Sequence, residues 1–208
     1  MTLIFSLQRY AEVAEAYLRG LERLVAGGGS PKGVYSVASF FVSRVDTEAD
    51  KRLEAVGSKD ALALRGRLAV ANAKLAYEHY EQAFSGPRWD FLAGKGANPQ
   101  RCLWASTSTK NPEYRDVLYV EELIGPDTVN TMPEETIRAF QDHGDVRGDT
   151  VTEDVDKAHA LLDDLAKAGV DYDDVTETLE LEGVQKFADS FAELLDGVAG
   201  KREALTAA

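Results

Sequence analysis

The sequence is poor in cysteine and histidine, and both shortages restrict its possible functions. Its one cysteine, Cys102, cannot form an internal disulfide. Because Cys102 stands in an apolar run, we interpret it as a buried small side chain rather than a nucleophile. The histidines, His79, His143 and His159, are far apart and have no metal-ligand spacing. We therefore expect them on the surface or on helices, and we expect no metal site.

Long hydrophobic runs and an excess of basic residues are also missing. No stretch is apolar enough for a transmembrane helix, and the first residues lack the order of a signal peptide, so we expect a cytoplasmic protein. The net charge of -13 and the pI near 4.7 argue against sequence-independent binding to nucleic acid or to an anionic membrane. The acidic residues concentrate between positions 145 and 182, where a solvated helix face explains them.

The remaining composition is that of an ordinary globular chain. With 208 residues, 44% of them hydrophobic and 28% charged, we expect a single domain over residues 1–208. The periodicity predicts strands and helices in alternation. In the first half we expect a strand at 2–5, a helix from Ser6 to the glycines at 27–29, a strand at 34–42, a helix over 46–85 broken near 57–58, and a loop at 86–100.

The second half continues the alternation. We expect a strand at 102–105, a short helix or turn at 119–126, a strand at 128–132, a helix from Pro133 to His143 with Ile137 and Phe140 facing the core, amphipathic helices through 155–165 and 184–198, and a frayed tail from Lys201. This order predicts an α/β fold with a parallel sheet. Four strand–helix units are too few for a complete eight-stranded barrel, so the chain is either a smaller doubly wound domain or part of a barrel.

Polar residues follow the strand predicted at 102–105. The segment Arg101–Pro112 passes from an apolar run to hydroxyl side chains and Lys110. Since ligands bind at the carboxyl ends of parallel strands, this cluster suits an anionic or polyhydroxylated small molecule, or else its hydroxyls cap the next helix. Arg44 follows the preceding strand and is either a surface residue paired with Asp46 or Glu48, or a fork for a phosphate.

Four long motifs resemble bacterial transaldolase in its longer form. They are Thr2–Ser6, Ala38–Asp46, Leu103–Pro112 and Asp116–Pro133, in the order of that family. The resemblance implies a (β/α)8 TIM barrel, of which this chain is the C-terminal half, with about four βα units and C-terminal helices. It also implies transfer of a dihydroxyacetone unit from sedoheptulose 7-phosphate to glyceraldehyde 3-phosphate in the pentose phosphate pathway. That chemistry uses a lysine Schiff base and needs no metal or organic cofactor.

The resemblance also implies roles for single residues. Thr2 matches the threonine that positions the catalytic water, and Ser39 matches the serine near the dihydroxyacetone hydroxyls. Arg44 matches the arginine that holds the substrate phosphate, and Ser106 matches the serine on the phosphate side.

The second cationic residue of the family's phosphate site stands at a different position in this sequence. Many family members carry an arginine two residues after the phosphate-side serine, where this sequence has Ser108. We assign the cationic role to Lys110, which offers a point charge in place of a bidentate fork.

The sequence also departs from the family. Thr2 would lie on the fifth barrel strand, so the first four strands, the Schiff-base lysine and both catalytic carboxylates are expected outside this chain, and none of its ten lysines stands in a predicted strand. The family commonly has valine in place of Met1, which suggests that the chain is the carboxyl part of a longer reading frame.

Three functional hypotheses follow. In the first, the chain is a transaldolase by family that is inactive alone, and activity belongs to a longer polypeptide or requires the missing N-terminal half in trans. In the second, it is a non-catalytic remnant or sugar-phosphate-binding half-barrel. Half a barrel would leave open sheet edges and uncover the inward faces of Ile4, Val37 and Leu103, so we expect association. In the third hypothesis Lys110 itself forms the Schiff base, although a lysine at a loop tip has little burial to activate it.

Overall fold

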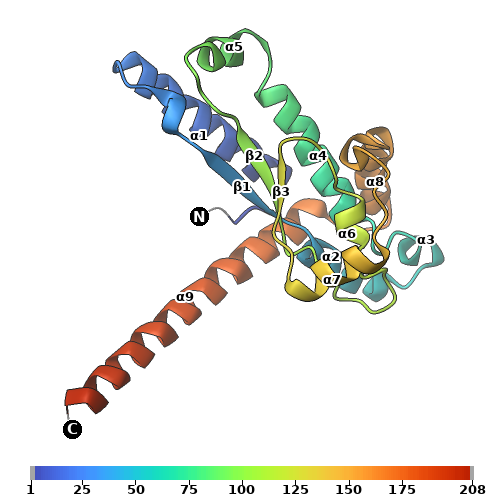
Figure 1. Ribbon diagram of the computed structural model, residues 1–208. Coiled ribbons are helices and arrows are strands. Elements are labelled where there is room, and N and C mark those ends of the chain that lie inside the picture. Colours follow the sequence, from blue (N-terminus) through green and yellow to red (C-terminus); the bar gives the residue numbers. More distant parts are fainter. Residues whose placement is uncertain (1–2, 207–208) are drawn as a thin grey trace.

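The computed structural model describes residues 3–206, and within them the strands form one parallel sheet in the order β1-β2-β3 (Figure 1). Strand β1 is Ser36–Phe41, β2 is Gln100–Ala105 and β3 is Thr128–Asn130. In register, Phe40 lies opposite Trp104, which lies opposite Asn130. The predicted α/β fold with a parallel sheet is confirmed.

The first predicted strand is shorter than expected. Ile4 forms an isolated parallel bridge with Phe40, in which the Ile4 N–H donates to the Ser39 carbonyl (3.2 Å) and the Phe41 N–H donates to the Ile4 carbonyl (2.9 Å). Ile4 therefore lies along the edge of β1 that is not paired with β2, without belonging to a full strand. Thr2 lies outside the described residues.

Helices surround this sheet and supply most of the structure between the strands. In chain order they are α1 (Leu7–Ala26), the 3-10 turn η1 (Pro31–Gly33), α2 (Ser43–Val56), α3 (Lys59–Leu62), α4 (Leu68–Ala83), α5 (Gly86–Gly94), α6 (Leu118–Glu121), α7 (Glu134–His143), the 3-10 turn η2 (Thr150–Thr152), α8 (Val155–Lys167) and α9 (Tyr172–Thr206).

Helix α1 has the predicted limits because local signals stop it at both ends. The Ser6 hydroxyl accepts the Arg9 N–H (3.1 Å), which satisfies one of the unpaired donors at the helix start. At the other end the Gly27 N–H donates to the Arg23 carbonyl, and the glycines that follow end the helix.

Between β1 and β2, two stretches differ from the sequence prediction. The predicted long helix begins three residues early, at Ser43, and is interrupted over residues 63–67 as well as near Gly57, whose φ is +70°. Residues 86–94 form α5 instead of a loop, because Pro87 stands at the start of the helix, where its missing N–H removes no hydrogen bond.

Helix α7 lies where it was predicted, but its buried side is different. Ile137 is exposed and Phe140 is half-buried, whereas Thr136 is the residue of α7 that is buried. No side chain caps the start of α7, and the Thr131 hydroxyl just before it donates to the Trp104 carbonyl (3.3 Å) at the end of β2.

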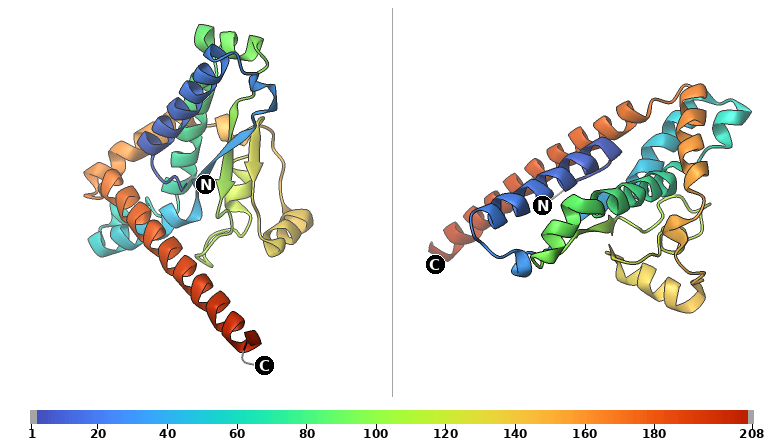
Figure 2. Two further views of the ribbon diagram at one scale, coloured as in Figure 1. Left: turned by 90° about the vertical axis from the view of Figure 1, so that its left-hand side faces the viewer. Right: turned by 90° about the horizontal axis from the view of Figure 1, so that it is seen from above.

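The two faces of the sheet differ in burial. Figure 2 shows α1 and α4 on one face of the sheet. Ala38, Phe40, Cys102 and Trp104 are fully buried on that face. The prediction for Ile4 was wrong: its bridge to Phe40 places it on this covered face, and it is 1% exposed.

The opposite face of the sheet is less covered. Val37 and Ser39 on β1 and Leu103 on β2 are half-buried. This is the face that the sequence assigned to the inside of a barrel, and Ser39 lies opposite Leu103 in register.

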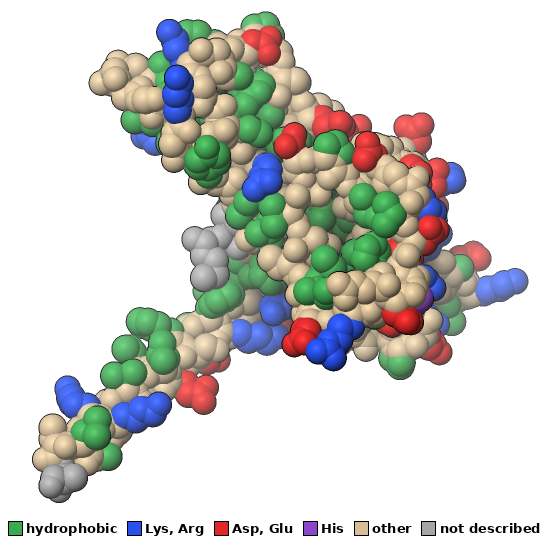
Figure 3. Space-filling model, in the orientation of Figure 1, with side chains coloured by type: hydrophobic (Ala, Val, Ile, Leu, Met, Phe, Trp, Pro, Cys, Tyr) green, Lys and Arg blue, Asp and Glu red, His purple; other side chains and the backbone are tan. Residues whose placement is uncertain are grey.

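The last helix, α9, begins on the body and then projects away from it (Figure 1). Val175 and Leu179 are buried in its first turns, while Val184, Phe187 and Phe191 are exposed further along the helix. Hydrophobic side chains are visible on the projecting part in Figure 3. The predicted apolar stripe of this helix is present, and no other part of residues 3–206 covers it. The predicted frayed tail is wrong, because the helix continues to Thr206.

Candidate functional site

Polar side chains from all three strands meet at the carboxyl ends of the strands, and we call this edge the polar rim. Parallel pairing continues past the strands: the Val42 N–H donates to the Ala105 carbonyl (2.9 Å), and the Ser43 N–H donates to the Ser106 carbonyl (3.0 Å). The two segments that leave β1 and β2 are thus held side by side where the predicted ligand-binding residues begin.

A pair of serines joins these two segments directly. The hydroxyls of Ser43 and Ser106 are 2.9 Å apart. Ser106 adopts a left-handed backbone conformation with φ of +57°, which costs about 1–2 kcal/mol in a residue other than glycine. Such strain is common at binding sites, where the surrounding contacts hold the residue in place.

The end of β3 joins the same rim. The Thr107 hydroxyl donates to the Asn130 side-chain oxygen (2.7 Å), and the Thr131 N–H donates to the Trp104 carbonyl (3.0 Å). Thr107 is fully buried, so this contact fixes the path of the chain directly after β2.

Arg44 lies in the first turn of α2, immediately after β1. Its guanidinium carbon lies 5.1 Å from the centroid of the Phe41 ring, a cation–π arrangement that holds the planar group near the rim. The acids that were weighed as its ion-pair partners bind other groups: Glu48 binds Arg52 (2.9 Å), and Asp46 accepts from the Tyr119 hydroxyl (2.8 Å).

The other predicted binding residues lie on or beyond the strands. Ser39 is on β1, on the less covered face of the sheet. Lys110 is exposed, and its ammonium donates to the Ser108 hydroxyl (2.7 Å). The structure thus joins Ser106 to the Arg44 helix through Ser43, while Lys110 lies further along the segment after β2.

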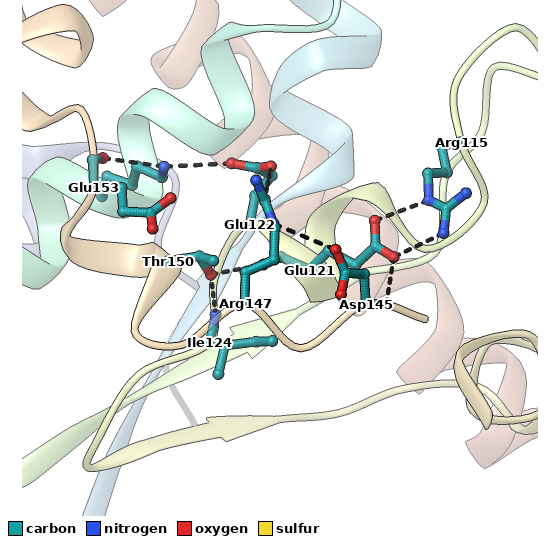
Figure 4. Close-up of polar contacts among 9 residues, drawn as sticks. Arg115, Glu121, Glu122, Ile124, Asp145, Arg147, Thr150 and Glu153 are labelled. Atoms are coloured by element: carbon teal, nitrogen blue, oxygen red, sulfur yellow. Dashed lines mark hydrogen bonds and ion pairs between the residues drawn. The ribbon is translucent and has the colours of Figure 1, made fainter. Parts of the chain in front are cut away.

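A short helix anchors the far end of that segment. Glu121 of α6 accepts from two Arg115 side-chain nitrogens, Nε at 2.8 Å and an Nη at 2.9 Å, and from the Asp145 N–H at 2.8 Å (Figure 4). The Arg115 guanidinium lowers the pKa of Glu121. The chain beyond α7 is thereby held against the segment after β2.

The residue directly after α6 adds a second anchor. Glu122 pairs with Arg147 and with the buried Lys74 of α4 (3.4 Å), and Lys74 also donates to the Glu153 carbonyl (3.1 Å) (Figure 4). This lysine is therefore part of a structural contact between α4, α6 and the chain before α8.

Cys102 and the histidines occupy the positions expected from the sequence. Cys102 is fully buried and burial raises the pKa of its thiol to about 12, so it is not a nucleophile at neutral pH. His79, His143 and His159 lie on α4, α7 and α8. Across residues 3–206 no group of three side chains suited to a metal ion is found, and no helix there is long and apolar enough to cross a bilayer.

Sequence reasoning missed a polar cluster beside the rim. Asp46 and Asp50 of α2 accept hydrogen bonds from the Tyr119 and Tyr114 hydroxyls. The spacing of the aspartates, one helical turn apart directly after a strand, is visible in the sequence, but their tyrosine partners are more than sixty residues away.

A parallel α/β sheet with polar groups at the carboxyl ends of its strands is consistent with part of a (β/α)8 barrel. The family model described as Transaldolase/Fructose-6-phosphate aldolase matches residues 1–198. The chain belongs to this family, and the resemblance seen in its motifs is confirmed.

Individual relatives are similar over nearly the whole chain. Transaldolase 1 of Streptomyces coelicolor is 60% identical over 198 residues, which are 95% of this chain and 52% of that protein. Transaldolase of Parafrankia sp. is 58% identical over 95% of this chain and 54% of its own length. Transaldolase of Thermobifida fusca is 55% identical over 99% of this chain and 56% of its own length. The chain spans about half the length of these curated relatives.

Proposed function

We propose that this chain provides the phosphate-binding part of a transaldolase. That enzyme would transfer a dihydroxyacetone unit from sedoheptulose 7-phosphate to glyceraldehyde 3-phosphate in the pentose phosphate pathway. The observation that carries the proposal is the polar rim, where Arg44 and Ser106 follow adjacent parallel strands and are joined through Ser43. A guanidinium and hydroxyls at one edge suit a phosphate, whose oxygens accept several hydrogen bonds.

The residues take distinct roles in this proposal. Arg44 offers the bidentate fork to the phosphate, Ser106 adds a hydroxyl donor, and Lys110 adds a positive charge. Ser39, on the less covered face of β1, is proposed to lie near the dihydroxyacetone hydroxyls. Thr2, which lies outside the described residues, is proposed to position a water for proton transfer.

The Schiff-base lysine is proposed to lie outside this chain. None of the ten lysines stands in a strand of residues 3–206, and Lys110, which follows β2, is exposed and bound to Ser108. The chain alone would then bind sugar phosphate without turning it over. Association through the open sheet edge or with a complementary half is part of the same proposal.

Binding is tested by titrating the chain with inorganic phosphate in a calorimeter at a fixed pH. We expect Arg44→Ala to weaken the affinity roughly 10- to 100-fold, the effect of losing hydrogen bonds to a charged group. Arg19→Ala is the matched control, because Arg19 is an exposed arginine of α1 paired with Glu15. Equal affinities of the parent and the Arg44 variant would contradict the phosphate role.

Catalysis is tested by borohydride trapping with fructose 6-phosphate followed by mass spectrometry. We expect no adduct on the chain alone, and turnover once it is refolded with the part of the Streptomyces coelicolor relative that it does not match. An adduct on Lys110 would instead show that Lys110 of this chain forms the Schiff base. Phosphate binding without turnover in the refolded mixture would favour a second function, a sugar-phosphate-binding remnant, which the absence of a strand lysine supports.

A further inference from the structure

Two aspartates of α2 are tied to two tyrosines of the segment that follows β2. Asp46 and Asp50 are 2% and 8% exposed and lie one turn apart on one side of the helix. The Tyr119 hydroxyl donates to Asp46 Oδ2 (2.8 Å), and the Tyr114 hydroxyl donates to Asp50 Oδ2 (2.6 Å). We call these two contacts the tyrosine–aspartate ties.

The other oxygen of each aspartate is bound as well. Asp46 Oδ1 accepts the Ala69 N–H (2.7 Å), and Asp50 Oδ1 accepts the Gly66 N–H (2.9 Å). Each carboxylate therefore bridges the start of α4 and the segment after β2. Because both oxygens are used, neither carboxylate can rotate without losing a hydrogen bond.

The backbone at Gly66 gives Tyr114 room to reach its aspartate. Gly66 has φ of +69°, and a Cβ placed there would lie 2.6 Å from the Tyr114 ring. Any other residue would meet the ring and would also strain the backbone. The close approach of the ring is thus a second observation, independent of the hydrogen bonds from the tyrosines, that Tyr114 packs tightly against the loop before α4, to which Asp50 of α2 is also bonded.

Burial of an ionisable carboxyl group costs free energy, because the charged form loses its hydration. Burial raises the pKa of Asp46 to about 7, although the bonds from Ala69 and Tyr119 act in the opposite direction. An apolar side chain in the same place would avoid this cost, so the carboxylates contribute direction and distance more than stability.

The ties link the two parts of the proposed phosphate site. Arg44 lies on α2, two residues before Asp46, and Ser106 and Lys110 lie on the segment that ends at the two tyrosines. Lys110 lines a hollow of about 210 Å³ together with both aspartates and both tyrosines. Rotation or displacement of α2 against this segment would change the distance between the proposed cationic groups.

We propose that Asp46 and Asp50 are positioning residues of the phosphate site, which hold the segment with Ser106 and Lys110 at the working distance from Arg44. They touch no ligand themselves and act through Tyr119 and Tyr114. This inference rests on the proposed function, since it needs the polar rim to bind a phosphate.

The test uses Tyr119→Phe and Tyr114→Phe, which remove one hydroxyl each and keep the rings. Tyr77→Phe is the matched control, because Tyr77 is also buried and donates one hydrogen bond, to the Pro126 carbonyl (3.0 Å), outside the ties. Affinity for inorganic phosphate is measured by calorimetry well below the unfolding temperature. Amide hydrogen exchange of residues 106–113 is measured on the same samples by mass spectrometry.

We expect each tie variant to bind phosphate roughly 3- to 10-fold more weakly, the loss expected when one hydrogen bond that orders a site is removed. Exchange in residues 106–113 should become faster in these variants, while the Tyr77 control keeps the parent affinity and exchange. Tie variants that bind phosphate as tightly as the parent would overturn the inference and leave the proposed function in place. A parent chain that does not bind phosphate would overturn both.

Discussion

Asn72 is the residue of α4 whose replacement we expect to destabilise the chain most clearly. It is fully buried, its amide donates to the Phe5 carbonyl (2.8 Å), and its oxygen accepts the Tyr172 hydroxyl (2.6 Å). Tyr172 in turn accepts the Leu7 N–H (3.0 Å). This relay joins the beginning of the chain to α4 and to the start of α9, so its loss affects three elements at once.

The expected magnitude follows from those contacts. Asn72→Ala removes two hydrogen bonds, each worth about 1 kcal/mol net, and leaves the buried Phe5 carbonyl without this partner at a further cost of about 1–3 kcal/mol. We therefore expect the free energy of unfolding to fall by about 3–5 kcal/mol. Tyr172→Phe removes the same bond to Asn72, so the double variant should lose less than the sum of the two single losses.

Urea unfolding followed by circular dichroism measures this loss. Asn98→Ala is the matched control: its amide donates to the Lys32 and Val34 carbonyls (3.3 and 3.1 Å), but Asn98 is only half-buried. We expect it to cost about 1 kcal/mol, because water replaces the lost bonds. Equal losses for the two asparagines, or strictly additive losses for Asn72 and Tyr172, would refute the reasoning.

Three further predictions concern single positions in the structure. The folded state raises the pKa of Asp46 to about 7, so the stability that the protonated group contributes is lost as pH rises from about 4 through 7. The free energy of unfolding of Asp46→Asn, measured with urea, should therefore rise relative to that of the parent between pH 5 and pH 8. Parallel pH profiles of the two proteins would contradict this. Gly66→Ala should lower the free energy of unfolding by about 2 kcal/mol or more, through backbone strain and contact with Tyr114, and unchanged stability would be inconsistent with the φ of +69°. Trp104→Phe should cost about 2–3 kcal/mol in the same assay, because it opens a cavity and removes the bond from the indole N–H to the Leu123 carbonyl (3.1 Å); a loss below 1 kcal/mol would argue against this contact.

Local signals in the sequence predicted most of the elements. The glycines after residue 26, the apolar period of α1 and α8 and the short apolar strands identified α1, α8, β1 and β2 close to their observed limits. Boundaries failed where a single local signal was weak, as in α5, where Pro87 starts a helix inside a stretch rich in glycine and proline.

The candidate site was only partly visible in the sequence. The positions of Arg44 and Ser106 directly after strands could be inferred, because the carboxyl ends of parallel strands share one edge. The contacts that hold them could not. The Ser43–Ser106 pair and the tyrosine–aspartate ties join residues more than sixty positions apart, and periodicity within one element carries no information about such partners.

The sequence by itself determined the family, the parallel α/β pattern and which residues stand at the ends of strands. Only the tertiary structure decided which faces are covered: Ile4 lies against the helices rather than in the open, and the apolar stripe of α9 lies exposed. The physical reason is that local propensity and apolar period depend on neighbours in the chain, whereas burial depends on what packs against a face. The fixed distance between α2 and the segment after β2 likewise exists only in the folded chain.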